Sequence, residues 1–182
     1  DATRPVPDIT AQIADAVRQT PGLTLRKVTR STLVADMPKI VEVFNDAWSK
    51  NWGFVPMTDR EMQALAAELR WVFEPELALI AEVDGQVAAI SLALPNLNEF
   101  FGDLDGRLLP FNWARLLTRL VFRRPRTVRL ALLGVKKEFR SIAMGGLSVL
   151  LYAEMHRRGA AIGVIGGELS WTLEDNERIN HG

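Results

Sequence analysis

The strongest candidate for a ligand site is the segment that joins an apolar run to a helical pattern, at residues 133–146. It reads Leu133-Gly134-Val135-Lys136-Lys137-Glu138-Phe139-Arg140-Ser141-Ile142-Ala143-Met144-Gly145-Gly146. A loop that leads into a helix aims several backbone N–H groups at one point, and the helix dipole favours an anion there. Small residues also let a phosphate approach the backbone closely. The segment therefore predicts a phosphate-binding loop.

This loop differs from the two common phosphate-binding motifs. No Gly-Lys-Ser/Thr follows, so it is not a Walker loop. Only Gly145 and Gly146 remain of the three glycines that a dinucleotide fingerprint requires. The alternative that the residues leave open is a strand-to-helix turn whose small residues serve packing.

Two strands and one helix are expected to position the loop. Residues 127–135 are apolar enough for a buried central strand. A helix should follow from about Gly145 to Arg158 and end at Gly159. Residues 161–170 favour a further strand, and a strand–helix–strand unit of this length predicts that the two strands are parallel neighbours.

The other expected elements come from turn, capping and periodicity signals. They are an arm or linker with a short helix at 1–22, a strand at 24–29, a helix that starts at Asp36 and Pro38, a second helix with a capping box at Thr58 and Glu61, a hairpin at Asp84-Gly85 between 77–81 and 87–94, and a helix at 111–124. Their order predicts a mixed α/β layer fold.

The composition limits the classes of protein to consider. The chain has 182 residues, 48% of them hydrophobic, and no net charge, which fits one folded domain and excludes a largely disordered chain. It has no cysteine and two histidines, so we expect no disulfide scaffold, no thiol catalysis and no metal site. We expect a cytoplasmic protein, since no uncharged apolar run reaches the ~18–20 residues that span a bilayer.

The charges are distributed unevenly. Residues 106–137 carry nine basic side chains and no acidic one: Arg107, Arg115, Arg119, Arg123, Arg124, Arg126, Arg129, Lys136 and Lys137. Such a block attracts phosphate, nucleic acid or an anionic surface, or it is a solvated face balanced by the acidic N-terminal half.

The sequence also resembles a known family. The segment from Arg140 to Gly145 matches the Gln/Arg-x-x-Gly-x-Gly/Ala loop of the GNAT acyltransferase superfamily, with Ala143 where glycine is usual. The resemblance is closer to one bacterial branch of GNAT-like proteins, in which such a domain looks like the C-terminal half of a longer chain. It is carried by the blocks 44–48, 51–56, 94–98, 106–110 and 168–176.

This resemblance implies a domain at 23–182 with an arginine-rich insert at about 96–126. It also implies a central mixed sheet splayed between the strands 127–135 and 161–170, with acetyl-CoA or another acyl-CoA in the gap. The expected cofactor-binding residues are Leu133, Gly134, Val135, Arg140, Ser141, Ile142, Ala143, Met144, Gly145, Gly146 and Asn176. A bulge at Gly134 would turn an N–H toward the thioester oxygen.

The same resemblance implies an N-acyltransferase with a small-molecule amine as acceptor. Glu168 would remove the proton of the amine, with Ser170 beside it, although Glu168 is equally well explained as a surface acid at a strand end. The expected substrate-binding residues are Asn45, Trp48, Trp52, Phe54, Asn96 and Asn98. Aromatic residues at this spacing are also typical of a core.

Two other functions compete with this one. Ala143 and the absence of a tyrosine past the last expected helix favour a non-catalytic GNAT-fold domain, structural or CoA-sensing, in a tandem protein. An aminoacyl-tRNA-dependent transferase ranks last, because few aromatic residues interleave the arginines. The arginine-rich helix is expected to cover the acceptor site, contact an anionic membrane or bind a second GNAT-like half or a homodimer partner. The ends of the chain lead us to expect an incomplete domain.

Overall fold

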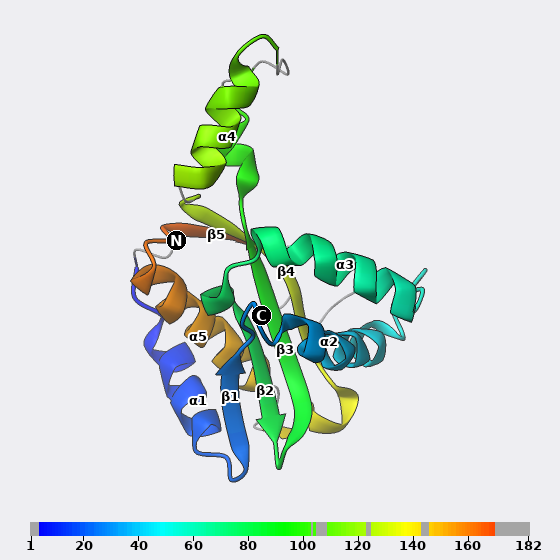
Figure 1. Cartoon of the computed structure of the whole chain (residues 1–182). Helices are drawn as coiled ribbons and strands as arrows, with labels where there is room; N and C mark the ends of the chain where they lie inside the picture. Colours follow the sequence, from blue (N-terminus) through cyan, green and yellow to red (C-terminus); the bar gives the residue numbers. More distant parts are fainter. Residues whose placement is uncertain (1–3, 103, 105–108, 123–124, 143–145, 170–182) are drawn as a thin grey trace.

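A five-stranded mixed sheet forms the centre of the protein (Figure 1). The computed structural model describes residues 4–102, 104, 109–122, 125–142 and 146–169. In spatial order the strands are β1 (Leu23–Lys27), β2 (Ala78–Val83), β3 (Gln86–Pro95), β4 (Thr127–Val135) and β5 (Gly166–Leu169). The pairs β1–β2, β2–β3 and β3–β4 are antiparallel. The pair β4–β5 is parallel, as the sequence predicted.

The described residues also form five α-helices and three short 3₁₀ helices. They are α1 (Asp8–Arg18), α2 (Leu33–Trp48), α3 (Asp59–Val72), η1 (Pro75–Leu77), η2 (Leu97–Phe100), α4 (Asn112–Phe122), η3 (Lys137–Phe139) and α5 (Gly146–Ala161). Two apolar clusters form the core, one with α1 and α5 and the other with α2 and α3. Because alternate strand residues point to opposite faces, these two helix pairs cover the two faces of the sheet.

Local signals located several elements correctly. Asp84 and Gly85 both have positive φ, 50° and 79°, and connect β2 to β3 as the predicted hairpin turn. Thr58 and Glu61 form the predicted capping box, with Glu61 N–H donating to the Thr58 hydroxyl and Thr58 N–H donating to the Glu61 carboxylate. Strand β4 has the predicted bounds.

Three predicted boundaries were wrong. The strand expected at 161–170 begins only at Gly166, because α5 extends to Ala161 and a turn with Gly163 follows it. Helix α2 begins at Leu33 rather than at Asp36 and Pro38, because the Leu33 and Asp36 N–H groups already donate to the carbonyls of Thr29 and Thr32. Helix α5 continues past Gly159 to Ala161, and Gly163, with φ of 88°, provides the left-handed residue after it.

The N-terminal arm docks on the sheet through α1. Ala14 and Val17 of this helix are buried in the cluster with α5. Arg18 donates to Glu154 of α5 at 3.1 Å. Glu154 is 3% exposed and also accepts from Arg157 and Arg158. These charge-assisted hydrogen bonds, first the one from Arg157, lower its pKa from 4.5 to about 2, although burial opposes the change.

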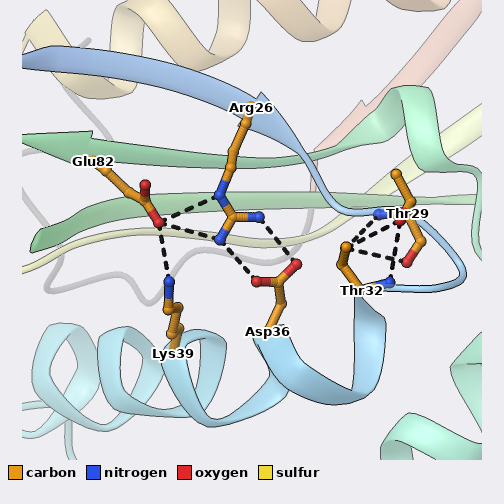
Figure 2. Close-up of polar contacts among 6 residues, drawn as sticks. All are labelled: Arg26, Thr29, Thr32, Asp36, Lys39 and Glu82. Carbon is orange, nitrogen blue, oxygen red and sulfur yellow. Dashed lines mark hydrogen bonds and ion pairs between the residues drawn. The ribbon is translucent and has the colours of Figure 1, made fainter. Parts of the chain in front are cut away.

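A second ionic network fixes α2 to the sheet (Figure 2). Arg26 of β1 donates to both oxygens of Asp36, at 3.0 and 2.7 Å, and also to Glu82 of β2. Lys39 donates to the same Glu82 at 3.2 Å. Burial acts to raise the pKa of Asp36, but hydrogen bonds from Arg26 and Thr32 outweigh it, so the pKa lies below its ordinary value.

Candidate functional site

Strands β4 and β5 form the parallel pair in which the sequence predicted a ligand. Their paired residues run from Thr127 with Gly166 to Leu130 with Leu169. Strand β4 then continues for five residues to Val135. The described part of β5 ends at Leu169, so the gap itself stays a prediction from the sequence.

The irregularity in β4 lies at Ala131, not at Gly134. Leu132 pairs with Leu92 and Leu130 pairs with Ala93, which leaves Ala131 as an extra residue between two paired ones. Gly134 is instead in regular register with Ile90. The predicted bulge at Gly134 was therefore wrong.

Gly134 is required for a close approach of α2. A Cβ atom there would lie 2.6 Å from the ring of Trp48 and 3.3 Å from Cβ of Ala47. Trp48 also packs on Phe44, with ring centroids 5.1 Å apart. The C-terminal end of α2 therefore lies directly over the end of β4.

Polar contacts fix the segment after β4 to the same end of α2. Arg140 donates through Nε to the Val135 carbonyl at 3.1 Å and through a terminal nitrogen to the Ala47 carbonyl at 3.0 Å. The Lys137 N–H donates to the carboxylate of Asp46 at 2.7 Å. Arg140 thus orients the loop backbone, and its contact with a pyrophosphate remains a prediction.

The remaining loop residues are partly described. Ser141 is exposed, Ile142 packs against the cluster that contains α5, and Gly146 is buried where that helix begins. Ala143, Met144 and Gly145 lie outside the described residues. The end of β4, η3 and the start of α5 therefore follow in the order that a strand–loop–helix phosphate site requires.

Glu168, the predicted base, lies on β5 opposite Arg129 of β4. Its two oxygens accept from Nε and a terminal nitrogen of Arg129 at 2.9 to 3.1 Å. Both side chains are 53% exposed. The partner Arg129 was not anticipated, although the register of two parallel strands could have suggested it. Ser170 and Asn176 lie outside the described residues.

The predicted acceptor-binding residues lie near the end of α2, in the segment after it, and at η2. Asn45 accepts from Met57 N–H at 3.0 Å and so holds the loop between α2 and α3. Phe54 packs on Phe44 with a centroid distance of 5.4 Å, beside Trp48. Trp52 is 90% exposed, and its contact with an acceptor stays a prediction.

Asn96 follows the last residue of β3 and caps η2, which contains Asn98. The amide of Asn96 donates to the Thr127 hydroxyl at 3.1 Å, and its oxygen accepts from Asn98 N–H. Glu99 accepts from the N–H groups of Arg126 and Thr127. These bonds fix the start of β4, and Asn98 is exposed.

The arginine-rich helix α4 projects away from the body (Figure 1). Several of its apolar side chains are exposed, among them Trp113 at 52%, Leu117 at 53% and Phe122 at 81%. Arg119 donates to the Phe100 carbonyl of η2 at 2.8 Å. Across the described residues, no helix combines the length and hydrophobicity needed to cross a bilayer.

An apolar cavity of about 200 Å³ lies between the sheet and the pair α2 and α3. Its lining includes Phe44 of α2, Leu69 of α3, Ala78 of β2, Leu92 of β3 and Leu132 of β4. No sequence motif predicted it, because a cavity depends on how closely distant elements approach one another.

Solved structures that share this architecture include acetyltransferases. An aminoglycoside acetyltransferase from an uncultured soil metagenomic sample, in complex with sisomicin, matches over 88% of this chain and 84% of its own, with a TM-score of 0.54 and 9% identity. A GNAT family acetyltransferase from Brucella melitensis in complex with acetyl-CoA matches over 86% and 80%, with a TM-score of 0.51 and 19% identity. The chain has the GNAT fold.

Two curated bacterial proteins are more similar in sequence than these GNAT structures. The "Bacterial ceramide synthase" of Caulobacter vibrioides (strain NA1000 / CB15N) is 38% identical over 161 residues, which are 88% of this chain and 42% of that protein. "Protein YghO" of Escherichia coli (strain K12) is 37% identical over 171 residues, 93% of this chain and 43% of that protein. The chain thus spans less than half the length of these relatives. No family model matches it.

Proposed function

We propose that this chain is the acyl-CoA-binding domain of an N-acyltransferase that joins an acyl group to an amine. The observation that carries the proposal is the parallel pair β4 and β5, with its extra residue at Ala131, followed by η3 and the start of α5. An irregular strand edge offers backbone groups to a pantetheine arm, and a helix start offers N–H groups to a pyrophosphate.

In this proposal the acyl-CoA lies along the end of β4. The backbone of Leu133 to Val135 bonds the pantetheine, and the loop from Arg140 to Gly146 receives the pyrophosphate. The contacts of Arg140 with the carbonyls of Val135 and Ala47 hold the start of that loop against β4 and α2. A binding group that is already held in position requires less ordering when the ligand binds.

The reaction needs a nucleophilic amine and a leaving thiolate. The amine nitrogen attacks the thioester carbon, a C–N bond forms, the C–S bond breaks, and the amine proton leaves. Glu168 is the proposed acceptor of that proton, directly or through water. Its two carboxylate oxygens accept three hydrogen bonds from Arg129, which orient the carboxylate beside the parallel strand pair.

The name of the Caulobacter relative suggests the acceptor class. A ceramide is a fatty-acid amide of a long-chain amino alcohol, so that name describes formation of an amide bond. We propose a long-chain amine as the acceptor. Because the relatives are more than twice as long as the matched part, the rest of such a protein is proposed to supply further acceptor contacts.

Calorimetry with CoA tests the cofactor site. Gly145→Val should abolish CoA binding, because a branched side chain obstructs backbone approach to a phosphate, and should leave the thermal midpoint nearly unchanged. Gly102→Val is the matched control, since a Cβ at that exposed glycine meets nothing within 4 Å. Equal affinities in the two variants would contradict the proposed loop. Failure of the unmodified chain to bind CoA would favour the purely structural alternative.

A further inference from the structure

The cavity between the sheet and the helices α2 and α3 extends along one face of the sheet, from β4 over β3 to β2. At β4 its lining includes the exposed Ala131 and the half-buried Leu132, whereas at β2 it includes the buried Ala78. Val28, next to β1, is 1% exposed and also lines it. Adjacent strands lie ~4.8 Å apart, so this path is about 10 Å long. Because Ala131 is exposed and Ala78 is buried, the cavity is open to solvent near β4 and closed at β2.

The lining has the chemistry of a site for an alkyl chain. Seventeen of its eighteen lining residues are hydrophobic, and the eighteenth is Ser91. Ser91 pairs with Leu79, which belongs to the cluster on the other face of the sheet, so its hydroxyl points away from the cavity. A charged or polar ligand would therefore be desolvated without a partner, whereas an alkyl chain requires none.

Contacts at both ends of α2 hold this helix over the cavity. Near its start, Asp36 and Lys39 are bound to Arg26 and Glu82 (Figure 2). At its other end, Trp48 contacts Gly134. Protein interiors normally contain few voids larger than a water molecule, so a cavity beneath a helix fixed at both ends is a space that the fold maintains.

We infer that this cavity receives the acyl chain of the thioester, which enters past Ala131 and extends toward Ala78. The inference rests on the proposed function, which positions the pantetheine along the same strand that carries Ala131. It adds the substrate class: acyl groups of medium or greater length rather than acetyl. An apolar cavity of about 150 Å³ is large enough for benzene, so about 200 Å³ accommodates a chain segment of at least that size.

The experiment is calorimetry with CoA and with its acetyl, octanoyl, dodecanoyl and palmitoyl thioesters. Each methylene that becomes buried should strengthen binding by about fourfold. Octanoyl-CoA has six more methylenes than acetyl-CoA, and burial of only four of them should make it bind more than about 100-fold more tightly. Ala78→Leu should reduce that ratio to less than about threefold with unchanged affinity for CoA, because the added side chain fills the closed end.

Ala66→Leu is the matched control. Ala66 is a buried alanine in the same cluster, at 6% exposure, but it does not line the cavity. This variant should retain the chain-length preference. Leu92→Phe is a second variant, at a half-buried residue that lines the cavity. It should also reduce the ratio of the affinities for octanoyl-CoA and acetyl-CoA, and it provides the test if Ala78→Leu does not fold.

The alternative outcomes distinguish the inference from the proposed function. Tight CoA binding with no chain-length preference would overturn the cavity assignment and leave the proposed function standing. A second outcome is that decylamine binds, that Ala78→Leu abolishes this binding, and that the affinity for acyl-CoA does not change with chain length. This outcome would assign the cavity to the amine and overturn our assignment. Absence of CoA and acyl-CoA binding in a folded protein would refute both.

Discussion

On one face of the sheet, α1 and α5 pack around Glu154, which three arginines neutralise, whereas on the other face α2 and α3 enclose an apolar cavity. The first face joins the N-terminal helix to α5, the helix that follows the proposed phosphate-binding loop. On the second face, the ionic network of Arg26, Asp36, Lys39 and Glu82 lies at one end of the helix. On the first face one buried carboxylate thus has partners from both helices, whereas on the second face the ionic contacts lie near the start of α2 and outside the apolar cavity.

This difference indicates that one face mainly stabilises the fold and that the other provides space for a ligand. A buried carboxylate with three charged partners fixes a single arrangement of α1 and α5, because moving any partner leaves a buried charge unsatisfied. On the other face the charges lie outside the apolar space, so that space remains suitable for a ligand. Stability should therefore depend more on Glu154 than on Asp36, and ligand selectivity more on the α2 side.

The largest effect on stability is expected for Glu154→Gln. The fall of its pKa from 4.5 to about 2 corresponds to about 3 kcal/mol in the free energy of unfolding. Since the pKa is lower in the folded state, this contribution is present above about pH 4.5 and is lost as the pH falls toward 2. Urea unfolding of variant and parent across this range should show the two free energies converging at low pH. A pH-independent difference would contradict the prediction.

An intermediate effect is expected for Asp36→Asn. Its carboxylate is 7% exposed and accepts two hydrogen bonds from Arg26, so its loss should lower the free energy of unfolding by about 2 kcal/mol. The pKa of Asp36 lies below 3.8, so the difference should disappear as the pH falls below about 4. Asp59→Asn, the same change at an exposed residue of α3, should stay within about 0.5 kcal/mol in the same urea titration. Equal effects would mean that the network does not hold α2.

The smallest effect on stability is expected for Glu168→Gln, at the edge between the two faces. Its ion pair with Arg129 is half exposed on both sides, so the free energy of unfolding should change by less than about 1 kcal/mol. If Glu168 removes the amine proton, turnover should nevertheless fall about 100-fold. Release of CoA thiol from an acyl-CoA and a long-chain amine, followed between about pH 6 and pH 9, measures this. Unchanged turnover would assign proton removal to water or to another group.

Local sequence signals predicted those elements whose determinants lie within a few residues. Asp84 and Gly85 adopt the positive φ values of a tight hairpin, and Thr58 caps α3 through a residue three positions away. The apolar run at 127–135 forms β4 with the expected bounds. In each case the residues that determine the structure are neighbours along the chain, so no distant contact was needed to predict them.

The tertiary structure decided what depends on distant residues. Helix α2 begins before its predicted start, with Asp36 in its first turn bonded to Arg26 of β1. Position 134 has no room for a side chain because Trp48 lies against it. The extra residue of β4 is Ala131 because of the register with β3. The cavity is bounded by residues of α2, α3 and three strands that are far apart in the sequence. These features depend on distances between separate elements, which are set by packing and not by local residue patterns.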